Sequence, residues 1–483
     1  MEFPIIIEIV NWLIFVYACA LFISYLLIAL LSTSELKKYH SRNRYSDFLK
    51  MLSFQKLPSV SIIAPAYNEE KTIVDNINCL LSLKYKDFEI IIVNDGSKDQ
   101  TLNKIIQYFD LIKTDMAYES QIITKNIRGI YKSRNNAYNH LTIIDKENGG
   151  KADALNAGLN YAHNELFLAV DVDSILEPDA LLRMVKPFIE ETKVKVIASG
   201  GVIRVANSCE IKNGRIIKVN FPKNQWAKYQ TIEYFRAFTL GRMAWSRING
   251  LLIISGAFGM FDRQTALAAG GYDTSTVGED LELVVRMRRY MHEVEKKKYK
   301  IAFIPDPLCW TEVPESLKML SRQRNRWTRG AIETIRKHMK MAFNPKYGRI
   351  GMISFPYWIF FEWLAPIIQF LGIGYVILLT IFGLLDVKVF LIMTLFVLSF
   401  AVMYSFFSVL LEAIYYNKYK NVTYLGNILL LSVMEMFVYQ PINMLFSLSG
   451  NIDYFFKKKS RHIWGNMTRK GFSGNTDQNS KQN

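Results

Sequence analysis

The chain has 483 residues and a formal net charge of +16; 50% of the residues are hydrophobic and 21% are charged. This balance excludes a disordered chain, and the long apolar blocks exclude a uniformly soluble one. The length suffices for one large domain or for two to three of average size. Nucleic-acid binding is disfavoured, because the central residues contain no nucleic-acid motif and no long basic run.

The N-terminal segment is predicted to form a transmembrane helix over residues 4–31. Residues 12–31 carry no charge, and a run of this length spans a bilayer. A signal peptide is the competing interpretation, since Ala20 closes a tripeptide that resembles a cleavage site. Glu2 and Glu8 precede the run without any Lys or Arg, and the run continues past that site, which favours a retained helix.

A segment of mixed composition, predicted to form one large α/β domain over residues 57–340, follows this helix. Lys and Arg gather between positions 37 and 50, just after the first span. The positive-inside rule therefore predicts a multi-pass protein of the cell (inner) membrane whose central domain is cytoplasmic. The positive net charge then fits flanks beside anionic lipid together with phosphate-binding loops.

A C-terminal membrane region is predicted over residues 352–448. It holds three apolar blocks, at 355–385, 390–411 and 422–448.

The basic tail, residues 449–483, creates a parity problem for this topology. Three full spans would place the tail outside, whereas its Lys and Arg residues predict the inside. One block is therefore not a simple span. The first block contains Glu362 and two prolines, so its opening part is a candidate to lie flat at the membrane interface. The last block contains Glu435 and a proline, which suits a re-entrant or interfacial segment. The polar end of the tail, 471–483, has the composition of a disordered segment.

Strands alternate with helices in the central domain. We predict strands at 59–64, 88–93, 141–144 and 168–173, and helices at 71–83 and 152–162. This alternation predicts an α/β fold with a mostly parallel sheet and helices on both faces. Ligands of such sheets bind beyond the carboxyl ends of the strands, where the polar motifs of this sequence fall.

The strand predicted at 168–173 ends in two carboxylates, Asp171 and Asp173. In extended chain, residues i and i+2 face the same side, so both carboxylates would face one site. Such a pair suits a hard divalent cation that also binds phosphate oxygens. The alternative is a strand end that leads into a helix cap.

Other strand ends carry groups that suit a nucleotide. Tyr67 is a candidate to stack on a base, and Glu69 and Asp95 are candidates to accept hydrogen bonds from base or ribose. For Asp95-Gly-Ser the alternative is an ordinary turn. Lys151 follows two glycines and precedes a helix, which suits a diphosphate. The Walker and Rossmann glycine patterns are absent, which argues against an ATPase and a dehydrogenase.

Two later stretches complete the candidate site. Glu279 and Asp280 open an amphipathic helix, where a carboxylate is either a general base or a charge that complements the helix dipole. Gln323, Arg326 and Trp327 lie in a stretch with four arginines in eight residues. This stretch suits a sugar ring stacked beside a diphosphate, or else a basic amphipathic helix at the membrane surface.

The order and spacing of these motifs resemble those of the membrane-embedded family 2 glycosyltransferases, which include cellulose, hyaluronan and poly-N-acetylglucosamine synthases. The resemblance runs from about residue 57 to residue 327, and the poly-N-acetylglucosamine synthase branch is the most similar. It implies a GT-A (Rossmann-like) domain flanked by transmembrane helices. It also implies inverting transfer from a nucleotide sugar, usually UDP-linked, with Mg²⁺ or Mn²⁺ as the cofactor.

The resemblance also implies roles for individual residues. Asp95 would contact the uridine, Asp171 the donor and its metal, and Asp173 the metal. Asp280 would be the base that deprotonates the acceptor. The diphosphate and the acceptor would be held by Gln323, Arg326 and Trp327. The motif before the base commonly begins with Thr in these synthases, and here Gly278 takes that place.

We therefore expect a glycosyltransferase that extends a β-linked polysaccharide from a UDP-sugar and is coupled to export. Its partners would be the UDP-sugar donor, a polysaccharide or lipid-linked acceptor and the lipid bilayer, without nucleic acid. The alternative is transfer of a single sugar to a lipid acceptor. A scaffold or transporter with a degenerate transferase domain is disfavoured by the intact carboxylate set.

Overall fold

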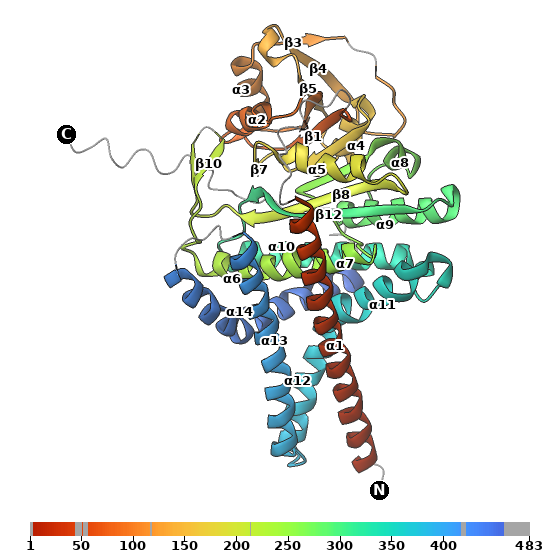
Figure 1. The fold of residues 1–483 in the computed structure, drawn as a ribbon, viewed down its shortest axis with the longest axis vertical. Coiled ribbons are helices and arrows are strands. Elements are labelled where there is room, and N and C mark those ends of the chain that lie inside the picture. Colours follow the sequence, from red (N-terminus) through yellow and green to blue (C-terminus); the bar gives the residue numbers. More distant parts are fainter. Residues whose placement is uncertain are drawn as a thin grey trace, which may run out of the picture.

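The computed structural model describes residues 3–43, 51, 57–115, 118–212, 214–416 and 422–457. An α/β domain stands above a group of long helices (Figure 1). The predictions for the tail beyond residue 457, including its disordered end at 471–483, lie outside the described residues.

The core of the domain is a ten-stranded sheet with the strand order β3-β4-β5-β2-β1-β6-β11-β8-β12-β7. Its strands are β1 (Val60–Ala66), β2 (Phe88–Asp95), β3 (Leu111–Thr114), β4 (Ile127–Ser133), β5 (Leu141–Lys146), β6 (Leu166–Val170), β7 (Ile175–Leu176), β8 (Lys195–Val205), β11 (Phe258–Asp262) and β12 (Tyr299–Thr311). A separate hairpin-like pair contains β9 (Glu210–Lys212) and β10 (Arg215–Lys218). The neighbours β5, β2, β1 and β6 are parallel, as predicted, whereas β11 runs antiparallel between β6 and β8.

Helices surround this sheet, and several lie between it and the long apolar helices (Figure 1). They are α2 (Ile73–Leu81), α3 (Thr101–Tyr108), α4 (Lys151–Tyr161), α5 (Ala180–Glu190), α6 (Gln225–Tyr234), α7 (Met243–Arg247), α8 (Arg263–Ala268), α9 (Glu279–Tyr290) and α10 (Leu317–Lys337). The π-helical segment η3 (Phe235–Arg242) joins α6 to α7. Helix α4 packs on β1 and β2, and α5 packs on β8 and β12.

Every strand and helix predicted in the domain is present, but the prediction for the end of the 168–173 strand is wrong. Strand β6 ends at Val170, and the chain then turns, with the Ser174 N–H donating to the Asp171 carbonyl at 2.9 Å. Asp171 and Asp173 therefore lie in a turn after the strand. The same-side argument from extended chain does not apply to them.

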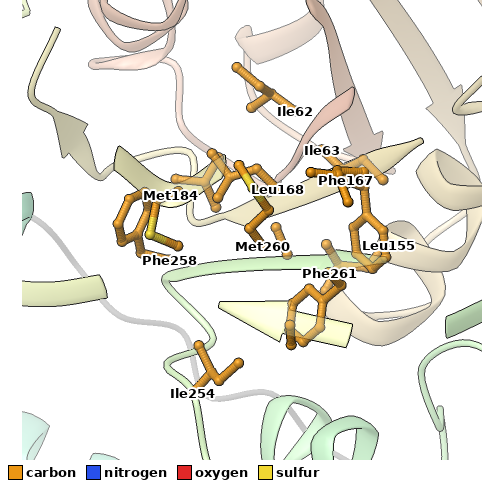
Figure 2. Close-up of a cluster of buried hydrophobic side chains, with 14 of the residues drawn as sticks. Ile62, Ile63, Leu155, Phe167, Leu168, Met184, Ile254, Phe258, Met260 and Phe261 are labelled. Atoms are coloured by element: carbon orange, nitrogen blue, oxygen red, sulfur yellow. The ribbon is translucent and has the colours of Figure 1, made fainter. Parts of the chain in front are cut away.

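Packing between neighbouring strands makes the platform below the site rigid. Figure 2 shows apolar side chains of β6 and β11 side by side in the buried cluster. Phe167 and Phe261 are register partners whose rings stack at a centroid distance of 5.1 Å, and Leu168 faces Met260 in the same way. All four are at most 2% exposed, and each contributes about 1.5–3 kcal/mol by burial. The strand ends that carry the polar motifs are fixed by this packing.

Within the residues that the structure describes, three helices are long and apolar enough to cross a membrane, or up to four if a bent pair counts as one span. They belong to α1 (Phe3–Asn43), α13 (Val387–Tyr415) and α14 (Val422–Phe456), and the pair joins 350–363 to α12 (Ala365–Ile381) with a bend of 45°. In Figure 1, α1, α12 and α13 extend away from the domain, whereas α14 passes beneath α6 and α10. The first block thus bends by 45°, and the last packs against α6 and α10; which of the two departs from a simple span stays a prediction.

Buried ion pairs attach the domain to the apolar helices. Arg204 on β8 pairs with Glu412 on α13, and Arg204 is fully buried. Arg236 on η3 binds Glu435 on α14 through both guanidinium nitrogens, one of them at 2.6 Å. Since an unpaired buried charge is costly, these pairs fix how the domain sits on its helices.

Removing one partner of such a pair is expected to destabilise the protein strongly. In the Glu412→Ala variant, Arg204 stays buried without its carboxylate, and we expect a loss of about 3–5 kcal/mol, measured as the free energy of unfolding in detergent. The double variant Arg204→Met with Glu412→Leu should recover most of the loss, because no charge then remains buried. A single variant as stable as the parent would show that this pair does not anchor the domain.

Candidate functional site

The loops after β1 and β2 are joined by hydrogen bonds at the carboxyl edge of the sheet. The Asn68 N–H donates to Ser97 Oγ at 3.0 Å, and the Glu69 N–H donates to Thr101 Oγ1 at 2.8 Å. Tyr67 is half-buried in the same segment. The two loops thus form one wall at the place where a base and ribose were predicted, and the roles of Tyr67 and Glu69 stay predictions.

Asp95, at the end of β2, holds the loop that leads into α4. Its Oδ1 accepts from Lys146 Nζ at 2.7 Å and from the Gly149 N–H at 2.9 Å, and its Oδ2 accepts from the Gly150 N–H at 2.8 Å. Lys146 also pairs with Asp153 at 2.5 Å. A carboxylate offers about four lone-pair positions, so capacity for one further donor, such as a uracil N–H, remains.

Lys151 is the point at which three distant segments meet. Its ammonium lies 2.6 Å from Asp171 Oδ1 beyond β6, 3.3 Å from Glu279 Oε1 at the start of α9 and 3.1 Å from the Gly256 carbonyl before β11. Gly150, which precedes Lys151, has φ = 87°, a conformation that favours glycine and that lets α4 begin at the lysine. The sheet edge therefore gathers oxygen ligands around one cation.

This arrangement fits a divalent cation. Burial alone would lower the pKa of Lys151, but the charges of Asp171, Glu279 and Asp280 raise it above its ordinary value. The ammonium thus marks a place where oxygen atoms stabilise positive charge. Hard cations such as Mg²⁺ and Mn²⁺ prefer oxygen donors of this kind.

Asp171 and Asp173 differ in how open they are. The Asp171 side chain is 25% exposed, whereas Asp173 is 3% exposed and lies near the Cys309 thiol of β12. Across the described ranges, no group of three or more His, Cys, Asp or Glu is placed to hold a metal by itself. Because Mg²⁺ commonly binds through one or two carboxylates plus substrate phosphates, a two-carboxylate site is compatible with a metal that arrives with the donor.

Glu279 and Asp280 form the first turn of α9. Burial raises the pKa of Glu279, a neighbouring Asp280 charge adds to the rise, and Lys151 opposes it. Asp280 is half-buried, and its Oδ1 accepts from the Leu281 N–H at 2.8 Å. A Cβ placed on Gly256 would lie 2.9 Å from Asp280 Oδ2, so Asp280 packs directly against the glycine backbone, where a larger residue would displace it. Of the two acids, Asp280 is the more open to an acceptor.

Two glycines bring α9 and α10 into backbone contact. A Cβ on Gly278 would lie 2.8 Å from the Gly330 Cα, and a Cβ on Gly330 would lie 2.7 Å from the Gly278 Cα. Real Cβ atoms essentially never approach so closely. Thr, common at this position in the synthases that the sequence resembles, would not fit here without movement of α10.

We expect Gly330→Ala to reduce activity strongly, because the new Cβ displaces the start of α9 and with it Asp280. Overpacking of this kind costs about 1–3 kcal/mol, and small displacements of catalytic groups can cost about 100-fold in rate. Initial rates and the thermal midpoint are the measurements. Gly372→Ala is a matched control, since a Cβ there meets nothing within 4 Å. Equal activity in both variants would contradict this account of the crossing.

The basic stretch of α10 divides into buried and open positions. Gln323 is 8% exposed, and its Oε1 has no hydrogen-bond partner in the part of the chain that the structure describes. Arg326 is near enough to Glu279 for its charge to act on that carboxyl. Trp327 is 42% exposed, with the Arg324 guanidinium 4.4 Å from the centre of its ring. Arg326 is thus placed near the carboxylate cluster, and the roles of Gln323, Arg326 and Trp327 stay predictions.

The sequence reasoning missed three cations of this region. Lys146 neutralises Asp95, and the two are register partners at parallel strand ends, a pairing that aligning the strand ends would have suggested. Arg324 binds both oxygens of Glu233 at 2.6 Å and so turns away from the site. Arg242, at the end of η3, stacks on the Phe238 ring at 4.0 Å; burial lowers its pKa to about 10, and Asp280 opposes the shift. No sequence signal marks Arg242, because its place depends on the tertiary fold.

Comparison with known proteins agrees with this geometry. The sequence matches the glycosyl transferase family 2 model over residues 61–247 and the glycosyl transferase family group 2 model over residues 166–417. It is 27% identical over 334 residues to the poly-beta-1,6-N-acetyl-D-glucosamine synthase of Staphylococcus aureus (strain COL), covering 69% of this chain and 68% of that protein. The synthase of Staphylococcus epidermidis is 27% identical over 319 residues, which are 66% of this chain and 65% of that protein.

The fold has a counterpart among solved structures. A mannosyltransferase from Pyrobaculum calidifontis, solved in complex with GDP-mannose and Mn²⁺, superposes with a TM-score of 0.52 at 14% identity, covering 90% of this chain and 99% of that one. This likeness confirms the GT-A-like α/β core flanked by apolar helices. Because the group 2 match alone spans more than half of the 483 residues, the chain belongs to the family 2 glycosyltransferases.

Proposed function

We propose that this glycosyltransferase transfers a sugar from a UDP-sugar, with inversion, to the end of a growing β-linked polysaccharide. The relationship to poly-beta-1,6-N-acetyl-D-glucosamine synthases supports a polymer product and makes UDP-N-acetylglucosamine the first donor to test. The observation that carries the proposal is the convergence of Lys151, Asp171, Glu279 and Asp280 at one sheet edge.

Four groups of this chain would carry the reaction. Asp280 takes the proton from the acceptor hydroxyl as that oxygen attacks the anomeric carbon from the side opposite the diphosphate. Lys151 and Arg326 bind the departing diphosphate and stabilise its developing charge. Trp327, exposed on the same helix as Arg326, offers an aromatic face for the acceptor sugar. A single displacement of this geometry inverts the anomeric configuration.

Asp171 and Asp173 are the proposed metal ligands. A Mg²⁺ or Mn²⁺ ion bound there together with diphosphate oxygens would neutralise the leaving group. The exposed side of Asp171 and the oxygen-only surroundings of Lys151 support this assignment.

The packing of α14 supports a topology with three spans. Helices α1 and α13 and the bent pair that ends in α12 would cross the membrane, and α14 would lie at its cytoplasmic surface under α6 and α10. Two spans, the bent pair and α13, then lie between the α/β domain and the basic tail, which places both on the same side. This arrangement answers the parity problem, and it puts Trp327 close to the membrane helices, where a polymer would leave.

The test is incubation of the purified full-length enzyme with labelled UDP-N-acetylglucosamine and Mn²⁺ or Mg²⁺. A ladder of products sensitive to an endo-acting hexosaminidase is the expected result. A single labelled lipid would support transfer of one sugar to a lipid acceptor and overturn the polymer. UDP release from another UDP-sugar alone would overturn the proposed donor.

A further inference from the structure

A cavity of about 480 Å³ lies behind the candidate base, between the loop before α9 and the C-terminal half of α10. Thr276 and Glu333 line it together with Arg336, Lys337 and Tyr454. Most of its charges are engaged with one another. Lys337 pairs with Asp273, and Glu282 pairs with Arg286 and His338. The Glu333 carboxylate instead binds the 276–278 loop.

Glu333 holds that loop through one oxygen atom. Glu333 Oε2 accepts from the Thr276 hydroxyl at 2.7 Å and from the Val277 N–H at 2.9 Å. Thr276 Oγ1 in turn accepts from the Gly278 N–H at 3.1 Å. The three residues before α9 are therefore tied in a chain to a single carboxylate of α10.

This chain of hydrogen bonds lies at the N-terminus of α9, which has no side-chain cap. Gly278 is the N-cap residue of α9, and it has no side chain to bind the free N–H groups of the first turn. The direction of the first turn, which carries Glu279 and Asp280, must therefore be set from outside the helix. The Gly278–Gly330 contact fixes the distance between this turn and α10. Glu333, three residues after Gly330, fixes the path of the backbone that leads into the turn.

We propose that Glu333 is a positioning residue that, through Thr276 and Val277, sets the orientation of Asp280 toward the acceptor. The inference rests on the proposed function, in which Asp280 is the base. Glu333 takes no part in the chemistry. It links α10, which carries Gln323, Arg326 and Trp327, to the turn that carries Asp280. The acceptor-binding residues and the base therefore keep a fixed position relative to one another.

Loss of Glu333 should leave α10 in place. Other residues of this helix hold it to α14 and α6: Asn325 donates to Asp453 Oδ2 at 2.8 Å, and Arg324 binds Glu233 and, at 2.8 Å, the Tyr439 hydroxyl. A variant of Glu333 is therefore expected to fold, with its effect confined to the 276–280 segment.

The experiment compares Glu333→Ala with Glu333→Gln in the full-length enzyme, using labelled UDP-N-acetylglucosamine and Mn²⁺. The Gln amide oxygen can accept both bonds that Oε2 accepts, so this variant should keep the parent kcat. Glu333→Ala should lose about 10- to 100-fold in kcat, a larger change than that in the KM for the donor, because Asp280 is displaced from the acceptor while Lys151 and Arg326 stay in place. Thr276→Val should behave like Glu333→Ala, and Thr276→Ser like the parent. Arg336→Ala, on the same helix and lining the same cavity, is the matched control with parent activity.

A second readout does not depend on catalysis. Amide hydrogen exchange of residues 276–281 should be slow in the parent and in Glu333→Gln and faster in Glu333→Ala, with the rest of α10 unchanged. Parent kcat and parent exchange in Glu333→Ala would overturn the inference, as would equal losses in Gln and Ala variants. If the parent enzyme forms no transfer product, the proposed function fails while the exchange data still decide whether Glu333 holds the loop.

Discussion

We expect Asp280→Asn to bind the donor normally and to lose transfer, with kcat lower by about 10²- to 10⁴-fold, the usual contribution of a general base. The Asn side chain is nearly isosteric, and its oxygen can still accept the bond that the Leu281 N–H donates to Asp280 Oδ1. The start of α9 should therefore stay intact. Donor affinity by titration and kcat by product formation separate binding from chemistry.

Glu279→Gln is the matched comparison, because Glu279 is the adjacent carboxylate in the same turn. Glu279 is buried against Lys151, at 3.3 Å, so its loss should change binding of the diphosphate more than it changes the proton transfer. A larger fall in kcat for Glu279→Gln than for Asp280→Asn would identify Glu279, and not Asp280, as the base. Parent turnover in Asp280→Asn would remove the base assignment.

The second large effect concerns the divalent cation. In Asp171→Asn, we expect the Mn²⁺ or Mg²⁺ concentration for half-maximal activity to rise by at least about 10- to 100-fold, since even supporting residues of metal sites contribute that much to affinity. Removal of divalent ions with EDTA should stop the parent enzyme, and Mn²⁺ should restore it. Titration of Mn²⁺ in the presence of UDP checks the affinity directly.

Asp145→Asn provides the control for the metal experiment. Asp145 also lies on a strand near the carboxyl edge of the sheet, but it accepts from Asn94 and Arg128, both at 2.7 Å, and has no contact with Lys151 or Asp171 among those described. Its cation requirement should equal that of the parent. Full activity of the parent in EDTA, or of Asp173→Ala with an unchanged cation requirement, would contradict the metal site.

Local pattern carried most of the fold prediction. The apolar runs of β1, β2, β5 and β6 are buried on both faces of the sheet, so they appear as short continuous hydrophobic segments, and the polar residues begin where each strand leaves the sheet. Since parallel strands end at one edge, the convergence of their motifs followed from the alternation alone. Strand β11 was not predicted, because the pairing of an antiparallel strand that begins 88 residues after the end of β6 depends on the tertiary fold.

Contacts between distant elements explain what the sequence reasoning missed in the site. The end of β6 was predicted three residues too late, because the Asp171 N–H donates to the carbonyl of the distant Ala257, and the chain turns there instead of continuing the strand. Gly278 stands where the synthases that the sequence resembles commonly have Thr. The sequence gives no reason for this difference, because the reason is the close contact with Gly330 in the folded protein. Glu333 and Arg242 carry no motif, and their importance comes only from which loop or carboxylate the fold brings to them.

Lys151 gives the carboxylates of the site an internal counter-ion. Its ammonium compensates the charges of Asp171 and Glu279, so the site needs no external ion to keep its shape. Removal of divalent ions by a chelator should therefore abolish activity without unfolding the enzyme.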